Sequence, residues 1–152
     1  MMLFRGPRAL PVLVAVWLFL PALAQAELGG SAESVVEVNR RFSAMHRQAW
    51  GASYRLHELA VPDGPVIREY ENQAGRVFAV SWSGAGRPDL RVLLGAHYDA
   101  YLAACKGRRA RGPHRIDVPG MTIVQGGTQR ALFGKVVLTG ELPEGLAVED
   151  LR

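Results

Sequence analysis

Four consecutive segments decide the fold: SYRLHELAV (53–61), VIREYEN (66–72), RVFAVSWSG (76–84) and PDLRVLLGAHYDAYL (88–102). The first three have the composition of strands. Turn residues separate them at 62–65 and 74–75, so they predict an antiparallel meander. The third segment is apolar on both faces, which is typical of a strand at the centre of a sheet.

Two details of this meander bear on function. In the first strand, apolar residues change face between Leu56 and Leu59, which predicts a bulge near His57-Glu58. In the second strand, Glu69 and Glu71 share one face, either as paired carboxylates or, more commonly for such charges, as cross-strand partners of basic residues such as Arg55. The opposite face, with Arg68 and Tyr70, is expected to be exposed for interactions.

The fourth segment has apolar residues at helical spacing from Leu90 to Cys105, which predicts one amphipathic helix over Pro88–Ala104. A capping box at Ser34–Glu37 and apolar residues at spacings of three and four predict a second, N-terminal helix that ends near Trp50-Gly51. Residues 121–139 predict a C-terminal hairpin. The predicted fold class is therefore α+β, with an antiparallel sheet of about five strands, one main helix packed on it and an N-terminal helix.

The first 26 of the 152 residues have the form of a cleavable signal peptide. Arg5 and Arg8 precede an apolar run from Leu10 to Leu23, and Ala24-Gln25-Ala26 supplies the small residues before the expected cleavage site. Two prolines divide the apolar run, which is shorter than the ~20 residues of a membrane-spanning helix. We expect export to the periplasm or beyond, no membrane span after cleavage, and a single domain over residues 27–152.

The charge of this domain is nearly balanced. The whole chain carries +4, and without Arg5 and Arg8 sixteen basic residues face fourteen acidic ones, which leaves +2. This balance gives no reason to expect nucleic-acid binding. Cys105 is the single cysteine, so no disulfide forms within the chain, and its place on the apolar stripe predicts a buried thiol.

The basic residues concentrate in one loop, predicted over residues 105–119. An anion or an acidic partner in the cell envelope is the ligand that such a loop suits, and a solvated loop without a function is the alternative. The candidate binding residues are Lys106, Arg108, Arg109, Arg111 and Arg115.

The string Gly95-Ala96-His97-Tyr98-Asp99 resembles a segment of zinc-dependent aminopeptidases, in which the histidine and the aspartate bind zinc. On a strand, His97 and Asp99 face the same side, but on the predicted helix they diverge by about 200°. The Glu-Glu pair that continues the aminopeptidase pattern is absent from this sequence. We therefore predict no catalytic residues, metal or cofactor, and keep a zinc hydrolase that uses His97 and Asp99 as the alternative function.

Nearly the whole mature chain resembles small exported bacterial proteins that share domain of unknown function 2844. The resemblance is carried by His57-Glu58-Leu59, Arg68-Glu69-Tyr70, Val77-Phe78-Ala79-Val80, Trp82, Pro88-Asp89-Leu90, Leu93-Leu94-Gly95 and Gly134. It implies export in a Gram-negative bacterium and assigns no catalytic site. Together, these patterns predict a periplasmic or secreted, non-enzymatic binding or accessory module with an unknown protein or anionic ligand as its partner.

Overall fold

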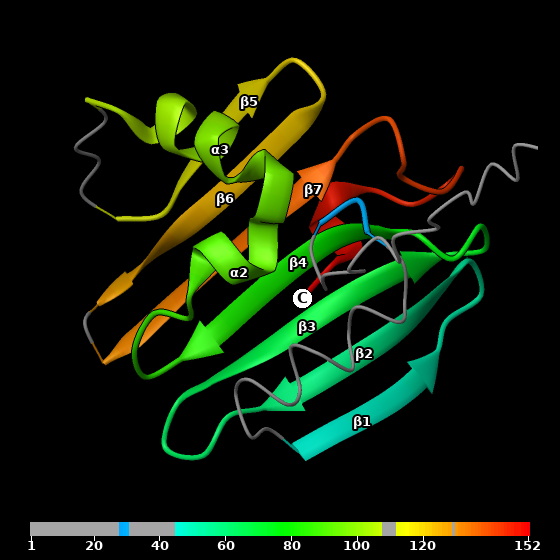
Figure 1. Ribbon diagram of the computed structural model, residues 1–152, viewed down its shortest axis with the longest axis horizontal. Coiled ribbons are helices and arrows are strands. Elements are labelled where there is room, and N and C mark those ends of the chain that lie inside the picture. Colours follow the sequence, from blue (N-terminus) through cyan, green and yellow to red (C-terminus); the bar gives the residue numbers. More distant parts are fainter. Residues whose placement is uncertain (1–27, 31–44, 108–111, 129) are drawn as a thin grey trace, which may run out of the picture.

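A single antiparallel sheet of seven strands organises the molecule (Figure 1). The computed structural model describes residues 28–30, 45–107, 112–128 and 130–152. The strands lie side by side in the order β1-β2-β3-β4-β7-β6-β5. Their bounds are β1 Met45–Trp50, β2 Tyr54–Ala60, β3 Pro65–Asn72, β4 Val77–Gly84, β5 His114–Val118, β6 Met121–Thr128 and β7 Ala131–Leu138.

Strand β4 lies at the centre of the sheet, as its sequence predicts. Its residues from Val77 to Trp82 are all buried, because both faces of the sheet are covered at this strand. The predicted meander over 53–84 is confirmed as β2, β3 and β4, which pair antiparallel in sequence order.

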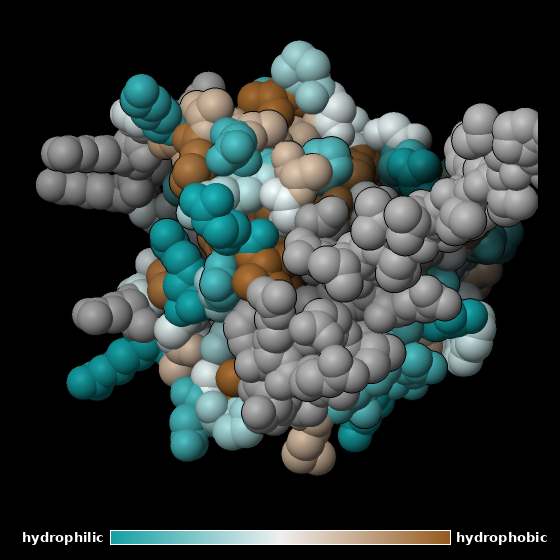
Figure 2. All heavy atoms as spheres, viewed as in Figure 1, coloured by the Kyte–Doolittle hydropathy of each residue, from teal (hydrophilic) through white to brown (hydrophobic). Residues whose placement is uncertain are grey.

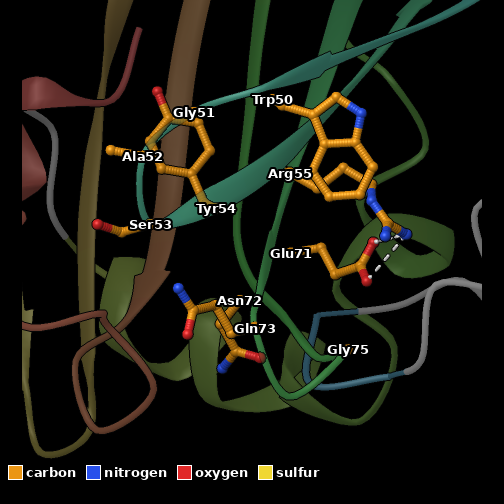
Figure 3. Close-up of a pocket in the computed structure, with 10 residues that line it drawn as sticks. All are labelled: Trp50, Gly51, Ala52, Ser53, Tyr54, Arg55, Glu71, Asn72, Gln73 and Gly75. Atoms are coloured by element: carbon orange, nitrogen blue, oxygen red, sulfur yellow. Dashed lines mark hydrogen bonds and ion pairs between the residues drawn. The ribbon is translucent and has the colours of Figure 1, made fainter.

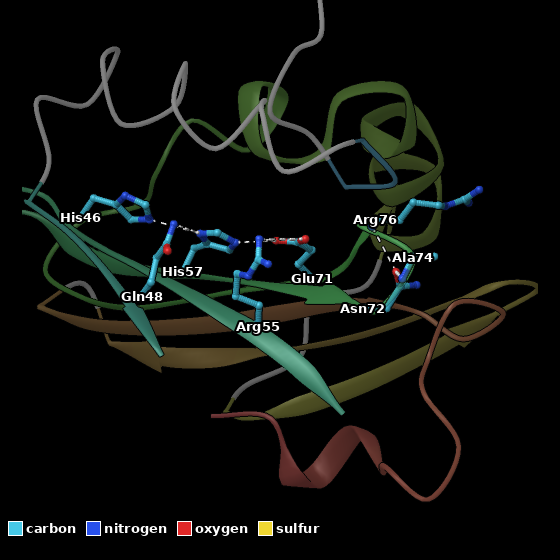
Figure 4. Close-up of polar contacts among 8 residues, drawn as sticks. All are labelled: His46, Gln48, Arg55, His57, Glu71, Asn72, Ala74 and Arg76. Atoms are coloured by element: carbon cyan, nitrogen blue, oxygen red, sulfur yellow. Dashed lines mark hydrogen bonds and ion pairs between the residues drawn. The ribbon is translucent and has the colours of Figure 1, made fainter. Parts of the chain in front are cut away.

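Helical segments cover one face of the sheet, and the C-terminal segment that contains the 3-10 turn η2 (Val148–Asp150) covers the other (Figure 1, Figure 4). The helical face buries the larger core, which includes Ile67, Trp82, Leu93 and Ile123. On the other face, Val148 and Leu151 pack against a smaller core of Tyr70, Phe78, Ala79 and Val137. In the described part of the chain, no helix is long and apolar enough to cross a membrane.

The helical region runs from Leu90 to Cys105 and is divided at Gly95. It consists of α2 (Leu90–Leu94), a 3-10 turn η1 (Gly95–His97) and α3 (Tyr98–Cys105). The Asp89 carboxylate caps the start of α2 by accepting hydrogen bonds from the backbone of Arg91 and Val92. The predicted continuous helix is therefore interrupted, since Gly95 adopts φ 46°, a conformation that other residues rarely adopt.

The predicted N-terminal helix is wrong where the structure describes it. Residues Met45–Trp50, its expected last turns, form edge strand β1 and pair with β2 in a regular register. The rest of that prediction, residues 34–44, lies outside the described residues. Neighbouring strands override local propensity here, because β2 offers an unpaired edge to which this segment hydrogen-bonds.

The sheet has seven strands rather than the predicted five. Besides β1, the additional strand is β5, His114–Val118, which the sequence places inside the basic loop. Only Ile116 of this short strand is buried, so its composition gives little signal. The predicted bulge near His57-Glu58 is also wrong, because β2 pairs with β3 without interruption from Tyr54 to Ala60.

The surface over the helical face is mixed in character. Figure 2 shows brown apolar residues in small areas among hydrophilic side chains, in the same view as Figure 1. The large hydrophobic residues that the described chain exposes are Met45, Trp50, Leu102 and Phe133. Two of these four, Met45 and Trp50, belong to β1, so the edge strand presents large apolar side chains to solvent.

Candidate functional site

A network of polar side chains lies on the helical side of β1, β2 and β3 (Figure 4). Its centre is the pair His57 and Glu71, whose Nε2 and Oε2 atoms are 2.8 Å apart. Both residues are buried, His57 with 2% and Glu71 with 5% of its surface exposed. A carboxylate only accepts hydrogen bonds, so the proton lies on Nε2 of His57.

Strand register brings a third charge to this pair. Arg55 lies directly opposite Glu71 in the β2–β3 pairing, and its Nη1 donates to both carboxylate oxygens of Glu71 at 3.3 and 3.2 Å. The predicted cross-strand use of Glu71 is thus confirmed. A buried carboxylate that contacts both a guanidinium and an imidazole has the partners that a charge removed from water requires.

Strand β1 completes the network on its outer side. The Nδ1 atom of His57 is 3.2 Å from Nε2 of His46 and 3.4 Å from Nε2 of Gln48. The two imidazole rings stack with centroids 5.4 Å apart. Partial burial, and secondly the charge of His57, lower the pKa of His46. His46 is therefore neutral at neutral pH, where it stacks without repulsion.

Glu69 is buried beside this network. It lies opposite His57 in the register and exposes 1% of its surface. Its Oε2 atom has no hydrogen-bond partner in the part of the chain that the structure describes. Burial raises the pKa of Glu69 to about 7. The Glu69 carboxyl is thus a weak acid that is buried on the sheet and inaccessible to a bulky substrate.

A pocket of about 290 Å³ opens where the β1–β2 and β3–β4 turns meet (Figure 3). Arg55 and Glu71 of the polar network form part of its wall, so the network ends at the pocket. At its edge stands Trp50, which is 74% exposed, and the guanidinium carbon of Arg55 lies 4.2 Å from the Trp50 ring centroid. The other lining residues are Gly51, Ala52, Ser53, Tyr54, Asn72, Gln73 and Gly75.

A second pocket of about 380 Å³ adjoins the first and shares Ser53, Asn72 and Gln73 with it. The side chain of Asn72 fixes the turn between the two pockets. Its Oδ1 atom accepts hydrogen bonds from the backbone of Ala74 and Arg76, each at 3.1 Å. Arg76 in turn forms an ion pair with Glu141, which lines the second pocket. The turn between the two pockets is therefore held in place by side-chain contacts as well as by the sheet.

The structure describes only two of the five residues of the predicted basic site, Lys106 and Arg115. Arg108, Arg109 and Arg111 lie outside the described residues, so their role as an anion site stays a prediction. Lys106 is exposed just after α3. Arg115 forms ion pairs with Asp117, at 3.0 Å, and with Glu149. Its place on β5 directs it to acidic neighbours of its own chain.

The structure also shows where the zinc-type string around His97 lies and that the expected surface with Tyr70 is not exposed. His97 ends η1 and Asp99 lies exposed in the first turn of α3. Among the described residues, no group of three or more His, Cys, Asp or Glu side chains is arranged to hold a metal ion. Tyr70 is buried, and its hydroxyl donates to the carbonyl of Arg152 at 2.8 Å. The face with Tyr70 is therefore covered and not an open surface.

Cys105 is partly buried, close to its predicted environment. It packs against the larger core, and Nε2 of Gln125 lies 3.6 Å from its Sγ atom. The same amide group, through Oε1, accepts a hydrogen bond from Tyr101 at 2.8 Å. These contacts give Cys105 a structural place between α3 and β6.

Sequence reasoning missed His57, His46 and Trp50 as members of one site. One signal was present: with Pro62–Pro65 as the turn, Arg55 and His57 fall opposite Glu71 and Glu69 in a regular hairpin. The predicted bulge obscured that register. His46 and Trp50 had no comparable signal, because their segment has a helical pattern.

A comparison with protein families covers the part of the chain that contains the polar network and the two pockets. The sequence profile of the family described as "Protein of unknown function (DUF2844)" matches residues 24–151. The chain belongs to the DUF2844 family. The match confirms the resemblance to domain of unknown function 2844, and the matched range includes every residue of the polar network and of the two pockets. No curated protein and no solved structure matches the chain.

Proposed function

We propose that this DUF2844 chain is an exported, non-enzymatic binding or accessory module of the cell envelope of a Gram-negative bacterium. Its ligand occupies the pocket between Trp50 and Gln73. The observation that carries the proposal is the pocket itself, in which an exposed indole lies beside a guanidinium that is ion-paired with the buried centre of the polar network.

Rigid support of these groups favours binding over a passive surface. Arg55 is held between the Trp50 ring and the Glu71 carboxylate, and Glu71 is held in turn by His57. Side chains fixed before a ligand arrives lose little conformational freedom when it binds. Burying His57 and Glu71 would lower stability if they were not paired with each other, and a binding role explains why the chain retains such a pair.

Export is the part of the proposal that rests on the sequence. The expected result is a periplasmic protein that begins at Glu27 when the full chain is produced in a Gram-negative host. Mass spectrometry of the osmotic-shock fraction measures this directly. Replacing both Ala24 and Ala26 by arginine should leave the longer precursor in the membrane fraction. Recovery of the unprocessed wild-type chain in the cytoplasm would contradict export.

Binding is tested with the mature chain, residues 27–152, and isolated cell envelopes. We expect the protein to co-sediment with envelopes and the double variant Trp50→Ala, Gln73→Ala to bind roughly tenfold more weakly, since it loses an exposed aromatic anchor. Met45→Ala is the matched control, because Met45 is an equally exposed apolar residue on the same strand. Equal sedimentation of all three proteins would remove the pocket from the proposal.

A further inference from the structure

The chemistry of the two adjoining pockets identifies a class of ligand. We infer that they bind an uncharged, polyhydroxylated ligand, a glycan chain, with Trp50 as the platform on which a sugar ring stacks. The inference rests on the proposed binding function and adds to it the kind of molecule that is bound. It is carried by three features of the pockets: the indole, the pairing of the charges and the polar groups on the walls.

The indole of Trp50 is presented as a platform. Arg55 covers one face of the ring, with its guanidinium carbon 4.2 Å from the centroid, yet Trp50 is 74% exposed. Most of the Trp50 side chain is therefore open to solvent at the edge of the pocket. Figure 3 shows its indole next to Arg55. A large, flat, apolar surface suits the C–H face of a sugar ring, whose hydrogens are slightly positive and are attracted to the π-electrons.

The charges on the pocket walls are already paired with one another. Glu71 pairs with Arg55 and His57, and Glu141 pairs with Arg76. A charged ligand would have to compete with these pairs, whereas a neutral ligand leaves them intact. Glu144, in the second pocket, is the third carboxylate of the two pockets together, and it is exposed to water, where an ion pair contributes little. The paired charges therefore favour an uncharged ligand.

Hydrogen-bonding groups line the part that the two pockets share. Ser53 supplies a hydroxyl and Gln73 supplies an amide, whereas the Asn72 amide is already hydrogen-bonded within the chain. Hydroxyl and amide groups both donate and accept, so they match the hydroxyl groups of a sugar in either role. Because the pockets adjoin, the arrangement suits a chain of more than one sugar, with one ring on Trp50 and the next beside Glu141.

Tryptophan fluorescence gives a direct test. The mature chain contains two tryptophans, exposed Trp50 and Trp82, which is 3% exposed, so a change in the emission of solvent-exposed indole reports on Trp50. The mature protein is titrated with soluble oligosaccharides of N-acetylglucosamine, of glucose in β linkage and of glucose in α linkage. A short lysine-rich peptide and heparin serve as cationic and anionic probes.

We expect at least one oligosaccharide to shift the emission saturably, with an affinity that changes little between low and high salt. In calorimetry, Trp50→Ala should bind that sugar roughly tenfold more weakly, Trp50→Phe should retain most of the affinity, and Met45→Ala should bind as the wild type does. Thermal unfolding of each variant verifies that the fold is retained.

Two results would overturn the inference. Salt-dependent binding of the peptide or of heparin at Trp50, without sugar binding, would assign a charged ligand to the pocket. Envelope binding that depends on Trp50, without saturable binding of any probe, would overturn the assignment of a glycan ligand while leaving the binding function in place. Loss of envelope binding altogether would instead remove the proposed function.

Discussion

Replacing Glu69 by glutamine should stabilise the protein above pH 7 and leave its stability nearly unchanged near pH 4.5. Glu69 is 1% exposed, and burial raises the pKa of its carboxyl from 4.5 to about 7. Between these two values the folded chain binds a proton that the unfolded chain releases. The stability that this difference contributes is present below pH 4.5 and is lost as the pH rises through 7.

The size of the effect follows from the shift of the Glu69 pKa. A difference of this magnitude corresponds to roughly 3 kcal/mol between the two ends of the pH range. Glutamine keeps the shape of the side chain and never ionises, so the stability difference between Glu69→Gln and the wild type should grow from near zero to about that value. His57, opposite Glu69, and Glu71, two residues along the strand, face the same region and remain in both proteins.

Urea unfolding at several pH values between 4.5 and 8.5 measures this difference. The exposed carboxylate Glu144 provides the matched control, because Glu144→Gln changes the same chemical group where water surrounds it. Its stability difference from the wild type should stay within about 0.5 kcal/mol at every pH. A constant difference for Glu69→Gln across the range would show that the Glu69 carboxyl does not titrate in this window.

The central part of the fold follows from the sequence because local and tertiary preferences agree there. Strand β4 is apolar on both faces and has neighbours on both sides, and the turns at Pro62–Pro65 and Ala74-Gly75 leave one way to pair β2, β3 and β4. The apolar residues on both faces of β2 are explained by the covering of both faces of the sheet. Leu59 packs under the helices and Leu56 lies on the face covered by the C-terminal segment, so no bulge is required.

The ends of the sheet could not be predicted, because tertiary pairing decides them. Strand β1 has a helical arrangement of apolar residues, and every one of its six residues is exposed, so no buried face fixes its conformation. The pairing of β1 with β2 fixes this conformation instead. Gly95 shows the reverse case: the apolar stripe from Leu90 to Cys105 is real, but the backbone changes direction at Gly95 while the stripe still packs on the sheet.

The candidate site was predictable only in part for the same reason. The Arg55–Glu71 pair depends on the register of one hairpin, which the turn at Pro62–Pro65 determines. His46, Gln48 and Trp50 reach the site from β1, the segment whose strand conformation the sequence does not reveal. A site assembled across strands has no contiguous motif, whereas the string around His97 looks like one and has no partner ligands among the described residues.

The packing of Trp82 against Gly134 leads to the second large effect. Gly134 lies opposite Trp82 in the β4–β7 pairing, on the helical side of the sheet. A Cβ atom at position 134 would lie 2.2 Å from Cζ2 of the Trp82 indole, far inside the normal contact distance. The indole is 3% exposed and enclosed by the larger core, so it has little space to move away.

Gly134→Ala should therefore destabilise the fold by about 3 kcal/mol or more and lower Tm by roughly 10 °C. Gly140→Ala is the control, because a Cβ atom there meets no other atom within 4 Å. Trp82→Phe removes the clashing ring, so the double variant Gly134→Ala, Trp82→Phe should lose less stability than the two single variants predict together. Thermal and urea unfolding of the wild type, the two single variants Gly134→Ala and Trp82→Phe, and the double variant measures this coupling. Additive losses would mean that the indole does not occupy the space above Gly134, and that glycine is required there for its backbone instead.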